Sequence, residues 1–225
     1  MPKFDPAKTQ TVADLFAEAR EGRDEAWRER FYAAVPDASL MAFDPQVNQG
    51  PDEFPYFHLA IPDPGPVTPF CVTHLLEVVL DNGFGIAIFG DSSRLEGQEW
   101  VFTYGDLLSY SLFGRFDGDP AAQLASGGDK VLVAAPSEAY LPARARKAMG
   151  NFVRRMYHHP DPRIALVCDP QATLMINLTL EDYDGDAGKL SAAVHYLSWF
   201  LPRTYNIAPM PASWSDSTFV PLVNN

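Results

Sequence analysis

The chain has 225 residues, 47% hydrophobic and 20% charged, so it is long enough to bury a core without disulfides or metals. Its 29 acidic and 17 basic residues give a net charge of −12 at pH 7, which disfavours nucleic acid and anionic lipid as partners. Cys71 and Cys168 lie in apolar settings and predict buried thiols in a reducing compartment. Because the sequence shows neither a secretory leader nor an apolar stretch of spanning length, we expect a cytoplasmic protein with no membrane span.

The first part of the sequence predicts helices followed by an extended arm. Residues 10–34 have helical spacing, in two pieces that Gly22 separates. Seven prolines then fall between Pro45 and Pro69, a density that argues against a continuous helix or a central strand. Aromatic residues in the same stretch argue against disorder, so we expect an arm that lies over the core.

The remainder of the chain predicts the core itself. Thr68 as N-cap, Pro69 in the first turn and Gly83 just past the end predict a helix. Further elements are expected at 85–90 (strand), 99–104 (strand), 105–113 (helix), 130–135 (strand), 142–157 (helix), 163–168 (strand), 173–180 (strand) and 186–201 (helix). Residues 204–225 read as a Pro- and Ser-rich tail that Trp214 and Phe219 hold down.

This order favours an α+β fold, with an antiparallel or mixed sheet, helices packed on one face, and an N-terminal helical segment and Pro-rich arm in front. We therefore expect residues 1–68 to form N-terminal helices and an arm packed on the core, and residues 69–225 to form the α+β core domain with a C-terminal tail. Over residues 69–203 the element order and the acidity resemble those of type III secretion chaperones. That resemblance implies a twisted antiparallel sheet backed by helices.

One short motif points to hydrolysis. Phe89-Gly90-Asp91-Ser92 follows a predicted strand and resembles the first block of the GDS-type esterases and lipases, which implies Ser92 as a nucleophile. Such an enzyme also needs a base and oxyanion donors. The family's Asp-x-x-His pair is missing, because no histidine of the chain has an aspartate three residues earlier. We therefore favour an Asp/Ser hairpin turn at this position.

Three aspartates invite a calcium interpretation. Asp182, Asp184 and Asp186 occupy alternate positions, as oxygen ligands do in a calcium loop. The glycine stands in the fourth place instead of the sixth, and the twelfth is Ala193 instead of glutamate. A charged turn at a helix N-terminus explains the same residues, and we expect no metal and no cofactor. His195 lies on a nearly all-apolar helix and is predicted to be a core histidine.

The helix expected at 142–157 carries the strongest feature. Arg144, Lys147, Arg154 and Arg155 fall on one face, and the opposite arc is apolar. The apolar arc consists of Ala145, Met149, Phe152, Val153 and Met156. A solvated helix face explains the pattern, and so does a docking surface for an acidic partner segment, for the chain's own acidic arm or for a phosphate.

The absence of a complete catalytic set favours a non-enzymatic protein-binding or regulatory module over an enzyme, of the adaptor, chaperone-like or immunity type. The expected partner is a protein that presents an acidic segment to Arg144, Lys147, Arg154 and Arg155; a homodimer stays open. The alternatives are a serine hydrolase of GDS type that uses Ser92 and a small-molecule sensor that uses the aromatic arm.

Overall fold

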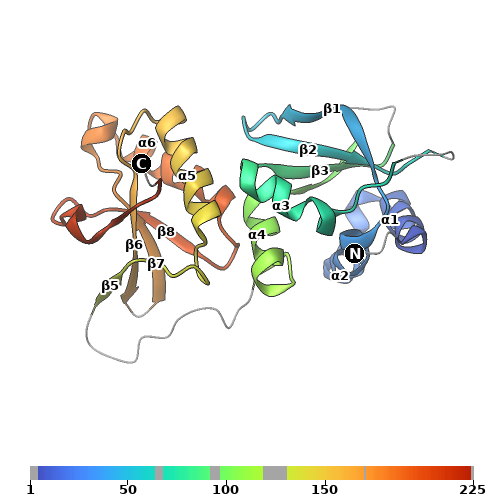
Figure 1. Ribbon diagram of the computed structural model, residues 1–225, viewed down its shortest axis with the longest axis horizontal. Helices are drawn as coiled ribbons and strands as arrows, with labels where there is room; N and C mark the ends of the chain where they lie inside the picture. Colours follow the sequence, from blue (N-terminus) through green and yellow to red (C-terminus); the bar gives the residue numbers. More distant parts are fainter. Residues whose placement is uncertain (1–4, 64–67, 92–96, 119–130, 170, 224–225) are drawn as a thin grey trace. The chain divides into compact units, whose positions relative to one another are not determined.

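The computed structural model describes residues 5–63, 68–91, 97–118, 131–169 and 171–223, coloured along the chain in Figure 1. The chain forms two compact units, Met1–Leu107 and Leu108–Asn225. Each unit contains helices and one mixed sheet, which confirms the α+β class with N-terminal helices. The units divide between residues 107 and 108, not between 68 and 69 as expected, because residues 41–60 pair with 85–102 in one sheet.

Two capped helices open the first unit. Helix α1 (Pro6–Ala17) begins after Asp5, whose side chain accepts the N–H groups of Ala7 and Lys8. Helix α2 (Glu25–Ala34) begins after Asp24, which accepts the N–H of Trp27. The expected division of this stretch into two helices is confirmed.

The sheet of the first unit has the order β1-β2-β3-β4. Its strands are β1 (Met41–Gln49), β2 (Pro55–Ala60), β3 (Gly85–Phe89) and β4 (Gln98–Phe102). Strand β2 lies between β1 and β3, so the prediction that the Pro-rich stretch holds no central strand is wrong. The prolines stand where a strand tolerates a residue without an N–H. Pro55 is the first residue of β2, and Pro45 lies on the edge strand β1, where the pairing is irregular between Ala42 and Val47.

Helix α3 (Val72–Asn82) belongs to this unit and begins later than predicted. The backbones of Leu40 and Phe70 exchange two hydrogen bonds of 2.7 Å, so Phe70 is held in an isolated bridge and the helix starts after Cys71. Gly83 ends the helix as expected, with φ at 74°. Strands β3 and β4 are antiparallel, as predicted, and α4 (Tyr104–Phe113) follows them.

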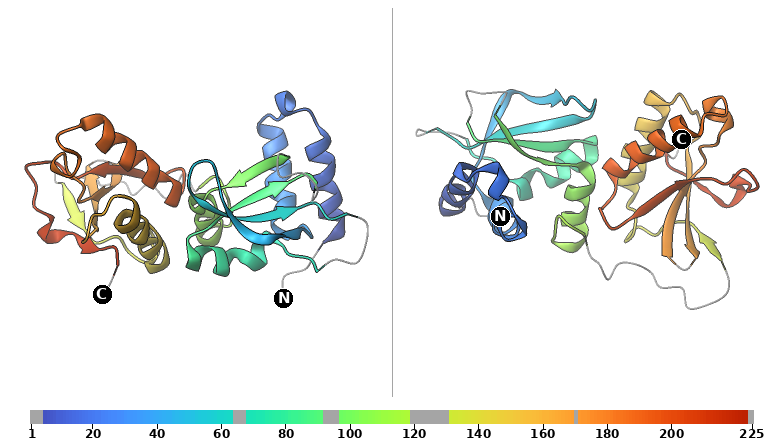
Figure 2. Two further views of the ribbon diagram at one scale, coloured as in Figure 1. Left: turned by 90° about the horizontal axis from the view of Figure 1, so that it is seen from above. Right: turned by 180° about the vertical axis from the view of Figure 1, so that it is seen from behind.

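The second unit is shown from two further sides in Figure 2. It contains β5 (Leu132–Ala134), α5 (Ala143–Met156), β6 (Arg163–Asp169), β7 (Gln171–Ile176), α6 (Ala187–Leu197), β8 (Asn206–Pro209) and β9 (Val220–Pro221). Its sheet has the order β5-β6-β7-β8, and β9 pairs with β6. Strands β7 and β8 are parallel and α6 connects them, which makes a β-α-β unit. The tail thus supplies two strands that the sequence did not predict, and Phe219 within it is buried.

The two cysteines are free in the structure, Cys71 buried as predicted and Cys168 only half-buried. Within the described ranges, every helix is too short or too polar to cross a membrane.

Candidate functional site

Helix α5 packs its apolar side into the second unit. Ala145, Met149, Phe152 and Val153 are buried, as the sequence predicted, whereas Met156 is 37% exposed. The helix also lies close to the C-terminal segment at Gly150, where a Cβ atom would come within 2.5 Å of the Val223 side chain. A side chain at this position would push the two segments apart, so the fit holds α5 in a fixed orientation.

Both ends of α5 are anchored by side chains. The carboxylate of Glu138 accepts the N–H of Ala143 at 2.8 Å and pairs with Arg146. The Ala143 N–H and then the Arg146 guanidinium hold the pKa of Glu138 below its usual value. At the other end, the Tyr157 hydroxyl donates to the Ala193 carbonyl of α6 at 3.0 Å, and burial raises the pKa of this tyrosine.

The outer side of α5 carries the four predicted contact residues, which we call the basic face: Arg144, Lys147, Arg154 and Arg155. Three of them are exposed, and Arg154 is half-buried, with its Nε donating to the Pro160 carbonyl at 3.2 Å. The 11 positions from Arg144 to Arg155 correspond to about 16 Å along the helix axis. Arg154 and Arg155 also stand in the last turn, where cations interact favourably with the helix dipole.

The charge on this face is not balanced within the helix. Helix α5 contains five of the 17 Lys and Arg residues of the chain and no Asp or Glu. Among the described residues, neither Lys147 nor Arg155 forms an ion pair. The fifth cation, Arg146, is used inside the unit, since it pairs with Glu138 and donates to the Leu141 carbonyl. The basic face is therefore a concentration of exposed positive charge on a rigid helix.

The two units differ in their net charge. The first carries seven Lys or Arg and 18 Asp or Glu, a net charge of −11. The second carries ten Lys or Arg and 11 Asp or Glu, a net charge of −1. The basic face thus belongs to the nearly neutral unit.

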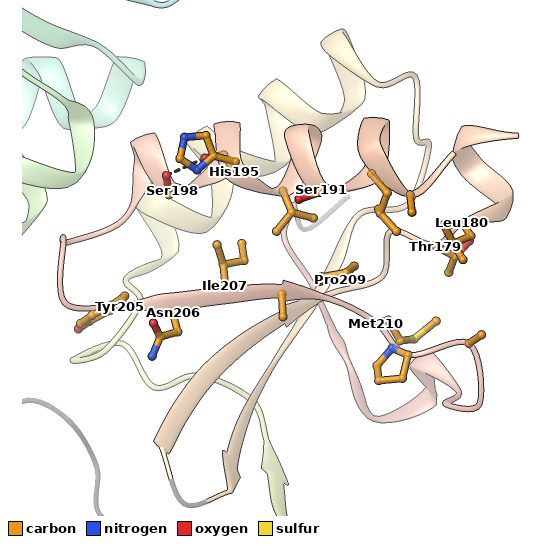
Figure 3. A pocket seen from close by; sticks show the side chains of 16 residues that line it. Thr179, Leu180, Ser191, His195, Ser198, Tyr205, Asn206, Ile207, Pro209 and Met210 are labelled. Atoms are coloured by element: carbon orange, nitrogen blue, oxygen red, sulfur yellow. Dashed lines mark hydrogen bonds between the residues drawn. The ribbon is translucent and has the colours of Figure 1, made fainter. Parts of the chain in front are cut away.

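A groove lies on another side of the second unit, between α6 and β8 (Figure 3). Its volume is about 660 Å³, within the usual range for ligand sites. His195 lines it and is exposed, so the prediction of a core histidine is wrong. Leu190, Val194 and Leu197 form the buried side of α6, and His195 lies off that side. The groove could not be read from the sequence, because β8 was not expected there.

No known protein family matches the chain. No curated protein and no solved structure is significantly similar to it either.

The other two predicted sites differ in what the structure says of them. Ser92 lies outside the described residues, so the hydrolase hypothesis stays a prediction.

The aspartates of the calcium hypothesis take part in local hydrogen bonds. Asp182 accepts the N–H and the hydroxyl of Thr179 at 2.7 and 2.9 Å, and Asp186 caps α6. Asp184 ends a 3₁₀ turn with a left-handed φ of 54°. Within the described ranges, His, Cys, Asp and Glu side chains form no group of three that could hold a metal ion.

Proposed function

We propose that the chain is a non-enzymatic protein-binding module that docks an acidic segment of a partner protein on the basic face of α5. The observation that carries the proposal is the carboxylate-free helix α5, with Lys147 and Arg155 exposed, in a chain of net charge −12. Exposed cations that have no carboxylate beside them on the same helix attract an acidic segment, and the net negative charge of the rest of the chain gives that segment no second place to bind.

The size and the rigidity of the face support a peptide segment as the ligand. The length of about 16 Å matches roughly five residues of extended chain. The anchors at Glu138, Gly150 and Tyr157 fix the helix before binding, so little order has to be gained when the partner docks. Nucleic acid is disfavoured as the ligand because the chain as a whole carries a net charge of −12, which repels a phosphate backbone.

The proposal is tested by fluorescence anisotropy with a labelled oligo-glutamate peptide at low ionic strength. We expect saturable binding that weakens as salt is added. The variant Arg155→Glu should weaken binding about tenfold, because it replaces an attraction by a repulsion. The matched control is Lys189→Glu, which makes the same charge change at an exposed position on α6.

The control should bind within about twofold of the parent protein. If both variants lose the same affinity, the peptide responds only to net charge and the proposal fails. It also fails if the parent protein does not bind the peptide.

A further inference from the structure

Strand β8 is an open edge of the second sheet. Among the described residues it pairs only with β7. The N–H of Met210 donates to the Ile176 carbonyl at 2.8 Å, so at this position the backbone faces β7. Backbone groups alternate along a strand, which turns the N–H and C=O of Ile207 and the C=O of Pro209 to the open side. The edge therefore offers one donor and two acceptors to an incoming strand.

The groove accompanies this edge. Ala187, Ser191 and His195 follow one another at helical spacing on α6 along the groove, and Ser198 in the 3₁₀ turn after α6 continues this stripe. The side chain of Ile207 points toward α6 from the opposite wall (Figure 3). The hydroxyl of Ser198 is engaged with the His195 carbonyl at 2.6 Å. The lining is mainly apolar and includes no Asp, Glu, Lys or Arg, so it complements uncharged side chains.

Acidic residues adjoin one end of the groove. Thr179 and Leu180 line the end near Met210, and Tyr205 and Asn206 line the other end (Figure 3). Leu180 is followed directly in the chain by exposed Glu181 and Asp182. These carboxylates would attract a cation at that end of a bound segment.

We propose that this groove is a second binding site, which takes an extended peptide segment with uncharged side chains and a cation at one end, added as a strand on β8. Main-chain hydrogen bonds to Ile207 and Pro209 hold the segment, and alternate side chains enter the groove against α6. Pro209 has no N–H, so the edge accepts pairing around Ile207 and leaves the peptide carbonyl opposite Pro209 without a donor.

The test uses a labelled peptide of alternating valine and threonine, flanked by lysine at both ends so that either strand direction meets the carboxylates. Addition of the peptide should slow hydrogen exchange at the Ile207 amide. The variant Ser191→Trp fills the groove and should weaken binding about tenfold or more. The matched control Ala192→Trp adds the same ring at an exposed position of α6 outside the groove lining, and it should bind within about twofold of the parent protein.

Any one of three results would overturn this inference. The first is equal affinity of the Ser191→Trp and Ala192→Trp variants for the lysine-flanked peptide, and the second is an unchanged rate of hydrogen exchange at the Ile207 amide when that peptide is saturating. The third is that the parent protein binds a glutamate-flanked peptide as tightly as the lysine-flanked one. The variant Arg155→Glu should bind the lysine-flanked peptide as the parent protein does, so the groove and the basic face can fail separately.

Discussion

The two units differ in how far their Lys and Arg side chains are paired. In the first unit, every Lys and Arg of the described residues pairs with a carboxylate of the same unit. The pairs are Lys8–Asp37, Arg20–Glu99, Arg23–Glu99, Arg28–Glu25 and Arg30–Glu18. In the second unit, α5 turns Lys147 and Arg155 to the exterior without such partners among the described residues. The difference follows from the sequence of α5, which places no Asp or Glu beside these cations on the helix.

Arg23 and Arg155 are the extremes of this comparison. The side chain of Arg23 is 9% exposed, pairs with Glu99 at 2.7 Å, and lies 5.0 Å over the ring of Trp27. Arg155 is exposed on the last turn of α5. The same residue type therefore stabilises the fold at one site and stays available for an external ligand at the other. Burial and neighbours decide which, and a count of charges does not.

The largest effect is expected where a buried cation loses its partner. Glu99→Gln should destabilise the first unit by about 2 kcal/mol, because Arg23 would be left without its carboxylate in a mostly desolvated place. Glu25→Gln is the matched control, since it removes the exposed partner of Arg28 and should cost less than about 0.5 kcal/mol. Hydrogen exchange of α2 amides measures both opening free energies. Equal costs would contradict the distinction between buried and exposed pairs.

A smaller effect is expected at the base of α5. Glu138→Gln should destabilise the second unit by about 0.5 kcal/mol at neutral pH, because the amide accepts from Ala143 less strongly and cannot pair with Arg146. The folded-state pKa of Glu138 is lowered, so its contribution is present above the usual pKa and is lost as pH falls through the folded value. Denaturant unfolding of both proteins across the acid range should show the difference disappearing. A difference that persists in acid would contradict this origin.

The smallest effect on stability is expected on the basic face itself. The double variant Lys147→Gln with Arg155→Gln should change the free energy of unfolding by less than about 0.5 kcal/mol, because neither side chain has an ion pair to lose among the described residues. Denaturant unfolding measures it. A loss of about 2 kcal/mol would mean that these residues serve the fold, as Arg23 does.

Features encoded by neighbouring residues were predictable from the sequence. The spacing of apolar and basic residues gave α5 and both of its sides, and turn residues gave the β3–β4 and β6–β7 hairpins. Features set by distant partners were not predictable. Phe70 is extended because it pairs with Leu40, and β8 is a strand because β7 lies beside it. The groove has β8 as one wall, so the sequence did not predict the groove either. The helical spacing of the basic residues also did not predict that Arg154 donates a hydrogen bond to the Pro160 carbonyl.

The decisive measurement is the affinity of the oligo-glutamate peptide for the parent protein, for Arg155→Glu and for Lys189→Glu, determined by fluorescence anisotropy at low ionic strength. We predict saturable binding by the parent protein, a loss of about tenfold for Arg155→Glu, and a change within about twofold for Lys189→Glu. Equal affinities of the two variants, or no binding by the parent protein, would contradict a basic face on α5 that docks an acidic segment.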